Sequence, residues 1–147
     1  MDKYTLLPDD TKVVEGRTLY RIKALREVCS GVPKGTLGGY IESLANLSQY
    51  GDAWVYGTAL VYENAEVYGD AQVYRNAVVC GNAQVCGNAQ VCGNARVCGN
   101  AVVCGNAQVC GDAQVYGNAV VYGDARVCGN KGSKPYTHIL GPLWKVG

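Results

Sequence analysis

The chain has 147 residues, enough for one domain, and its 13 basic and 12 acidic side chains leave a formal net charge of +1. No basic stripe follows the sequence, which argues against binding to the nucleic-acid backbone. Residues 1–4 lack the layout of a signal peptide, and no apolar run approaches membrane-spanning length. We therefore expect a cytoplasmic protein with neither nucleic acid nor membrane as a partner.

The first part of the chain predicts a β-hairpin. Residues 11–14 and 17–22 are rich in β-formers and flank Glu15-Gly16, a pair typical of a tight turn. Residues 8–10, Pro-Asp-Asp, predict a second turn before the hairpin, and residues 29–35 predict a loop.

From Gly51 onward thirteen six-residue units of the pattern G-[ND]-A-x-V-[YC] follow one another without an insertion, with departures only at Thr58, Glu63 and Arg75. Its third position is always Ala, from Ala53 to Ala125, and its fifth is always Val, from Val55 to Val127. A fixed period of this kind is typical of repeat architectures. Because Ala, x, Val and Tyr or Cys alternate, each unit predicts a short strand with Ala and Val on one face.

The Gly-Asn and Gly-Asp pairs predict a corner after every strand, since Gly adopts positive φ freely and Asn and Asp tolerate it. Three strands and three corners close a triangular coil of 18 residues, and stacked coils form parallel sheets about 4.8 Å apart per coil. We expect Ala and Val inside the narrow coil, with Tyr and Cys outside.

The repeat resembles the hexapeptide repeat of left-handed parallel β-helices, in which an aliphatic residue is followed four positions later by a small one. More closely, Gly38-Gly39-Tyr40-Ile41-Glu42, the stretch at residues 46–49 and Trp54-Val55 resemble the YdcK-like hexapeptide proteins of bacteria and their phages. The resemblance implies an all-β, single-stranded left-handed parallel β-helix with three hexapeptides per triangular coil. We assign residues 1–45 to an N-terminal β-hairpin cap, 46–130 to the β-helix and 131–147 to a short C-terminal cap.

An open end of such a coil exposes unpaired backbone groups and an apolar floor, so the N-terminal segment is expected to cover it. Leu37, Ile41, Leu44 and Leu47 are predicted to fill the opening. At the other end, residues 136–140 predict a last strand, with Pro142 and Trp144 closing the coil and no further domain after them.

The outward x positions form one column on each face of the triangle. The first face carries Trp54, Gln72, Gln90, Gln108 and Arg126. The second face carries Leu60, Val78, Arg96 and Gln114, and the third carries Glu66, Gln84, Val102 and Val120. Corner residues such as Asn64, Asn82, Asn100 and Asn118 predict ladders of amide hydrogen bonds. Glu63 and Arg75 replace a corner Gly, which we expect to carry a modest cost.

The third face is the candidate interface. Val102 and Val120 point outward beside Cys86, Cys104 and Tyr122, and exposed apolar area of this kind marks interfaces. Left-handed β-helix enzymes that resemble this fold are commonly trimers, so a dimer or trimer through this face is the hypothesis. The alternative is ordinary β-propensity on a solvated sheet.

Seven of the eight cysteines occupy the Tyr/Cys column of the repeat. Vertical neighbours are Cys80 with Cys98, Cys86 with Cys104, and the row Cys92, Cys110 and Cys128. Their Cα atoms would lie about 4.8 Å apart, which a disulfide can bridge. We expect free structural thiols, because disulfides are rare in a reducing cytoplasm. A straight column of thiolates cannot surround a tetrahedral metal ion.

The sequence offers little for catalysis. Acyl transfer, the best-known activity of this fold, uses a His as general base, and this chain has one, His138, outside the coils. A metal hydrolase resembling γ-class carbonic anhydrase needs three His ligands, and no base is spaced to activate a Cys nucleophile. We therefore predict no enzyme, no catalytic or metal residues and no cofactor.

Two function classes remain open, with a third behind them. The first is a non-catalytic structural or scaffold module that self-associates. The second is a binding module, encoded by a phage or bacterium, that sequesters a host protein or a small ligand. A degenerate hexapeptide acyltransferase is the third.

Overall fold

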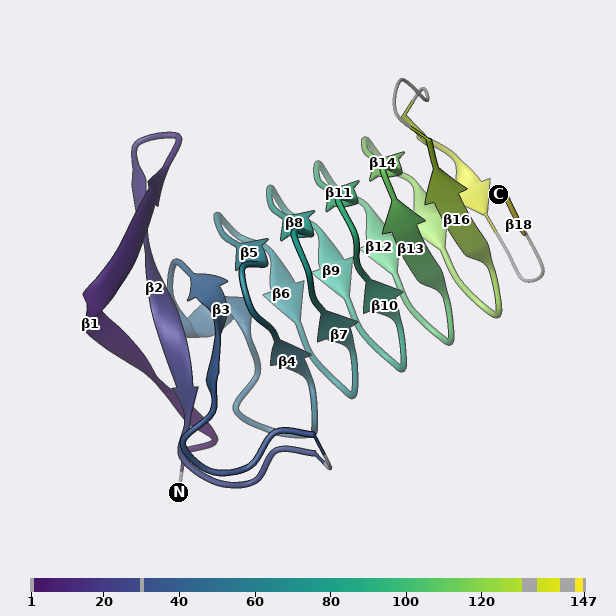
Figure 1. Cartoon of the computed structure of the whole chain (residues 1–147). Coiled ribbons are helices and arrows are strands. Elements are labelled where there is room, and N and C mark those ends of the chain that lie inside the picture. The colour runs from purple at the N-terminus through teal and green to yellow at the C-terminus, as the bar shows by residue number, and fades with distance from the viewer. Residues whose placement is uncertain (1, 30, 131–134, 141–144, 147) are drawn as a thin grey trace.

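A computed structural model describes residues 2–29, 31–130, 135–140 and 145–146. The described chain is all-β, with one 3-10 helix of three residues, η1 (Leu44–Asn46). Figure 1 shows a long hairpin at the N-terminal end and a regular coil that advances from it toward the C-terminus. The near strands β4, β7 and β10 rise to β5, β8 and β11, and the chain descends behind through β6, β9 and β12. The coil is therefore left-handed, as the resemblance implies.

Three parallel sheets form the walls. The sheet on the first face contains β4 (Trp54–Val55), β7 (Gln72–Val73), β10 (Gln90–Val91), β13 (Gln108–Gly111), β16 (Arg126–Gly129) and β18 (Lys145–Val146). On the second face, the coil strands are β5 (Leu60–Val61), β8 (Val78–Val79), β11 (Arg96–Val97) and β14 (Gln114–Val115). On the third face they are β6 (Glu66–Val67), β9 (Gln84–Val85), β12 (Val102–Val103), β15 (Val120–Val121) and β17 (Ile139–Leu140).

Coil strands pair in parallel with the strand one coil away, as Val79 does with Val97 and Val103 with Val121. These pairs are 18 residues apart, which confirms three units per coil and the three outward columns. Between coils, the amide at each x position donates to an Ala carbonyl of the following coil, as Leu60 N donates to Ala77 O at 3.0 Å. The Ala carbonyls that end each corner therefore point toward the N-terminal end of the coil.

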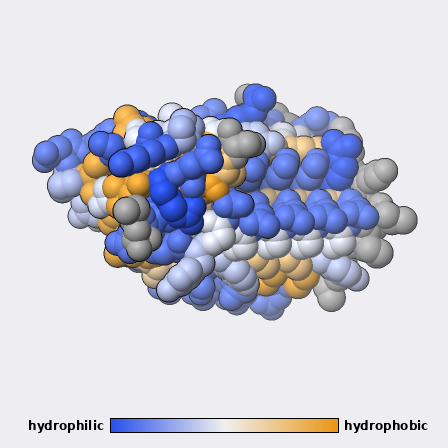
Figure 2. All heavy atoms as spheres, turned by 90° about the horizontal axis from the view of Figure 1, so that it is seen from below, coloured by the Kyte–Doolittle hydropathy of each residue, from blue (hydrophilic) through white to orange (hydrophobic). Residues whose placement is uncertain are grey.

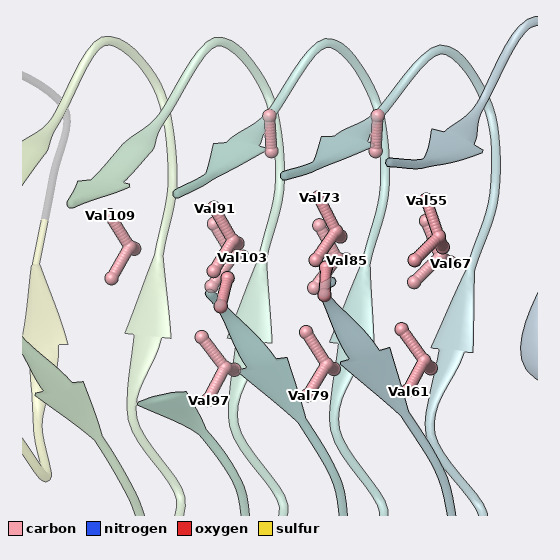
Figure 3. Close-up of a cluster of buried hydrophobic side chains, with 14 of the residues drawn as sticks. Val55, Val61, Val67, Val73, Val79, Val85, Val91, Val97, Val103 and Val109 are labelled. Carbon is pink, nitrogen blue, oxygen red and sulfur yellow. The ribbon is translucent and has the colours of Figure 1, made fainter. Parts of the chain in front are cut away.

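The repeating Ala and Val fill the interior. Every Ala from Ala53 to Ala125 and every Val from Val55 to Val127 in these two columns is buried. Figure 3 shows the Val side chains stacked in columns inside the coil. Branched side chains in contact with identical neighbours above and below give a continuous, dry core. This confirms the predicted interior.

The geometry of the corners explains why the first position of the unit is almost always Gly. Gly99 has a φ of 72°, and a Cβ atom there would lie 2.8 Å from the amide nitrogen of Gly117 in the next coil. Both the backbone conformation and the close approach favour Gly. Glu63 and Arg75 adopt the same region, with φ of 59° and 62°. The predicted ladder is also present, since Asn82 Nδ2 donates to Asn100 Oδ1 at 3.1 Å.

The N-terminal hairpin consists of β1 (Tyr4–Val14) and β2 (Arg17–Ala24), joined at the predicted turn by Glu15 and Gly16, both with positive φ. The second predicted turn, at residues 8–10, is wrong. These residues lie within β1, where the pairing register shifts between Leu7 and Thr11. The irregular backbone brings the Asp10 carboxylate within 2.7 Å of Arg21 Nε, so an ion pair stabilises the bulge.

The hairpin joins the coil through β3 (Leu37–Ile41). Strand β3 pairs antiparallel with β2 and parallel with β5, so the hairpin extends the sheet of the second face. Gly38 and Gly39 in β3 lie against the first coil, where a Cβ on Gly39 would come within 2.5 Å of the Ala59 carbonyl oxygen.

The predicted filling of the N-terminal opening is half right. Ile41 and Leu47 are fully buried, but Leu37 and Leu44 are 50% and 55% exposed, because they sit on the outer side of β3 and at the start of η1. Other buried side chains of the cap pack against the first coils in their place: Tyr4, Ile22, Ala24, Val28 and Val32. The opening is covered by the hairpin and the loop after it.

Trp54 is buried, although its x position predicted an outward side chain in the solvent. The ring of Tyr4 packs against it edge-on, with ring centroids 6.3 Å apart. The side chain does leave the outer wall of the first coil, but the beginning of the chain covers that part of the wall.

At the C-terminal end, Ile139 and Leu140 form β17, which pairs with β15, and Tyr136 forms a separate bridge to Val115. The predicted last strand at residues 136–140 is therefore shorter than expected. Pro142 and Trp144, predicted to close the coil, lie outside the described residues.

Candidate functional site

The third-face patch consists of Val102, Val120, Cys86, Cys104 and Tyr122. Val102 and Val120 are register partners on β12 and β15, and both are half-buried. Cys86, Cys104 and Tyr122 lie on successive coils in the Tyr/Cys column beside this face. The side chain of Tyr122 is 39% exposed. The structure thus brings together all five residues that the sequence singled out.

The patch is uncharged and borders a polar surface. Seen from below in Figure 2, rows of hydrophilic residues follow the coils, and a hydrophobic group interrupts the surface beside them. Toward the N-terminus the Tyr column continues with Tyr68, whose pKa is raised to about 12 by its interaction with Cys86 and by burial. Burial and Cys86 also raise the pKa of the Cys104 thiol. These groups are neutral near pH 7, so apolar contact is the main interaction that the patch offers.

An open hollow lies at the N-terminal end of this face. Its lining residues are Ala45, Ser48, Glu66, Val67 and Tyr68. The Glu66 side chain is exposed, and the hollow is wide rather than deep, so it lacks the enclosed apolar walls of a small-molecule pocket.

A second cluster lies on the second face. The sequence identified Cys80 and Cys98 as vertical neighbours but did not single out the cluster around them as a site. Cys80 and Cys98 lie on adjacent coils between Tyr62 and Tyr116, with Arg96 in the neighbouring outward column. Cys80 is buried and Cys98 is half-buried. The available signal was that Arg96 precedes Cys98 by two residues, which places both side chains on the outside of the same strand.

The side chain of Cys80, followed by the Arg96 guanidinium, lowers the pKa of Cys98 to about 7 against the opposing effect of burial. The pKa of Cys80 moves upward, chiefly through its interaction with Cys98 and through burial. The two thiols therefore differ, with Cys98 the better nucleophile near neutral pH.

Comparison with known families supports the repeat assignment. The model of the YdcK β-solenoid repeat matches residues 89–105, 107–123 and 113–129. The coils of this chain are thus similar to the YdcK β-solenoid repeat. The three matches lie in the most regular coils of the solenoid, where the 18-residue pairing is uninterrupted. No curated protein matches the sequence.

The solenoid contains one disulfide among its described residues, between Cys110 and Cys128. The sequence predicted free thiols here, so that expectation is wrong for this pair. The reason is the register, because β13 and β16 pair these two residues directly and bring their Cα atoms to 4.6 Å. The other six cysteines are free thiols.

In the described part of the solenoid, no three His, Cys, Asp or Glu side chains gather closely enough to hold a metal ion. His138 lies beside β15, where its backbone carbonyl accepts a hydrogen bond from the amide of Val120 at 3.3 Å, and its side chain is exposed. No helix in the described residues is long and apolar enough to cross a membrane.

Proposed function

We propose that this β-solenoid is a rigid, non-catalytic structural module that self-associates through the third-face patch into a dimer or trimer. The observation that carries the proposal is the stacking of Val102 on Val120 at the surface, flanked by Cys104 and Tyr122. Two adjacent outward valines on consecutive coils form continuous apolar area, and burying it against a second copy is favourable.

The regular coils support a structural role. From Gly51 to Asn130 every unit has the same length, so no loop extends from the described coils to form a pocket between them. Ligand sites depend on concave, partly enclosed surfaces, and catalysis depends on a titratable group within reach of the substrate. The third-face patch, which is flat and carries uncharged side chains, favours contact with another flat surface.

The proposal is tested by the assembly state of Val102→Lys/Val120→Lys, measured by multi-angle light scattering across a range of concentrations. Gln90→Lys/Gln108→Lys is the matched control, because these residues are register partners at the same repeat position on the first face. We expect the wild type and the control to form the same oligomer and the Val variant to be monomeric. An assembly unchanged in the Val variant, or a monomeric wild type, would contradict the proposal.

A further inference from the structure

Cys80 and Cys98 are placed for a disulfide on the second face. Their strands pair through Val79 and Val97, and the Cys80 amide donates to the Val97 carbonyl at 2.9 Å. The two cysteines occupy the same repeat position, one coil apart, as the disulfide-bonded Cys110 and Cys128 on the first face. The coil spacing therefore places two such thiols within bonding distance without a change of backbone.

The surroundings of the two thiols are asymmetric. Cys80 is buried in a cluster with Leu19 and Tyr62, where strand β2 of the hairpin covers it, and Cys98 lies at the edge of that cluster. Reagents in solution therefore reach Cys98 first.

Arg96 supplies the charge at this site. Its Nε atom is buried and has no hydrogen-bond partner. A buried, unpaired donor of a guanidinium is costly unless an anion is near, and the Cys98 thiol is a group beside Arg96 that can become one. Electropositive, partly exposed surroundings of this kind distinguish reactive cysteines from inert ones.

We propose that Cys98 is a reactive thiol that exchanges with low-molecular-weight disulfides, and that Cys80 then resolves the mixed disulfide into a Cys80–Cys98 bond. The site is distinct from the third-face patch and does not depend on self-association.

The exchange has two steps. The Cys98 thiolate attacks one sulfur of the small disulfide, which forms a mixed disulfide and expels one small thiolate. The Cys80 thiol transfers its proton to that thiolate, attacks the Cys98 sulfur and expels the second small thiolate. Two electrons pass from the cysteines to the small disulfide, which ends as one thiol and one thiolate.

The chain contains its own control. Cys86 and Cys104 are also vertical neighbours at the same repeat position, but Gln84 and Val102 stand where the other pair has Val78 and Arg96. No cation accompanies them there, and the pKa of Cys104 is raised where that of Cys98 is lowered. The two pairs share their backbone spacing and differ in the neighbouring charge and in the burial of Cys80.

The test treats the purified protein with oxidised glutathione at pH 7, at a dilution where light scattering shows a monomer, so that the third-face patch is free. Each modified cysteine is assigned by fragmentation mass spectrometry over time. We expect Cys98 to react roughly tenfold faster than Cys104, and Arg96→Gln to slow Cys98 roughly fivefold, because a lower thiolate fraction is partly offset by higher nucleophilicity. The wild type should accumulate the Cys80–Cys98 disulfide, and Cys80→Ser should retain glutathione on Cys98. Cys86→Ser is the control that leaves Cys98 unchanged.

Equal rates at Cys98 and Cys104 would overturn the reactive site, and this comparison is made within the wild-type protein, so it does not depend on the folding of any variant. A mixed disulfide that persists on Cys98 in the wild type would overturn the resolving role of Cys80.

Discussion

The ammonium group of Lys3 donates a 2.8 Å hydrogen bond to the carbonyl oxygen of Ala53. The Ala carbonyls of the first coil point toward the N-terminal end, where no preceding coil offers them an amide. The other two walls are closed in the same way. The Tyr40 amide donates to Ala59 O at 3.0 Å, and Asn46 Nδ2 donates to Ala65 O at 2.8 Å. Each wall of the triangle thus begins with a different donor to an Ala carbonyl.

Because Lys3 is buried, we expect the stability of the protein to depend on pH in an unusual way. Burial, followed by the charge of Arg26, lowers the pKa of Lys3 from 10.5 to about 8. Between these values the unfolded chain binds more protons at this residue than the folded one, so the free energy of unfolding rises as the pH rises. Burial raises the pKa of Tyr4 and Tyr62, which favours the unfolded state above about pH 10.

We therefore expect the wild type to gain roughly 1 kcal/mol of stability between pH 8 and pH 9, below the range in which the tyrosines of the unfolded chain ionise, measured by urea unfolding. Lys3→Met should remove this gain, and Lys23→Met, at an exposed position of β2, should keep it. A Lys3→Met protein whose stability still rises over this range would show that Lys3 does not cause the effect.

Truncation of the Asn46 side chain should lower the free energy of unfolding substantially. Its Oδ1 accepts from the amides of Glu42 and Ser43, and its Nδ2 donates to the carbonyls of Glu63 and Ala65. The side chain is fully buried, so Asn46→Ala leaves polar backbone groups without partners and without water.

We expect Asn46→Ala to lower the free energy of unfolding by about 3 kcal/mol, as measured by urea denaturation. The comparison is Asn64→Ala, which removes one exposed amide bond to Asn82 and should cost less than about 1 kcal/mol. Similar losses in the two variants would argue against a closing role for Asn46.

Arg75 and Glu63 both have a positive φ, which is strained for these residues, but only the Glu63 side chain makes contacts that offset the strain. The Arg75 side chain is exposed, whereas Glu63 Oε1 accepts a hydrogen bond from the Gly81 amide of the next coil at 3.1 Å. Glu63 Oε2 also lies 3.7 Å from the guanidinium of Arg17 in the hairpin. Glu63 therefore ties the hairpin to two coils.

We expect Arg75→Gly to stabilise the protein by about 1 kcal/mol in thermal unfolding, because a non-Gly residue at positive φ is costly. Glu63→Gly should bring no gain, since relief of strain is offset by the loss of the bond to Gly81. An equal gain in both variants would mean that the Glu63 contacts contribute little.

The strict columns explain why the coils were predictable. A position that is Ala in every unit has one environment, and a corner that is almost always Gly has one backbone conformation, so spacing alone gave the walls, the interior and the vertical neighbours. The third-face patch was predicted from the same 18-residue spacing. Its five residues do lie together, and its role as an interface stays a prediction.

Apart from the Cys110–Cys128 disulfide, the errors concern the segments outside the repeat and their contacts with it. Trp54 follows the pattern, but contact with Tyr4 decides its burial. Leu37 and Leu44 are apolar and near the opening, yet the path of β3 leaves them half exposed while Ile22 and Val32 are buried. No periodicity specifies such contacts.

The sequence by itself determined the coil, because its interactions join identical positions at a constant separation of 18 residues. Only the tertiary structure decided how the coil begins and which thiols differ. The carbonyls closed by Lys3 and Asn46 are distant from those residues in sequence, and the burial of Cys80 depends on a hairpin about 60 residues earlier in the chain. Burial and unpaired backbone groups depend on such long-range contacts, which a local pattern does not contain.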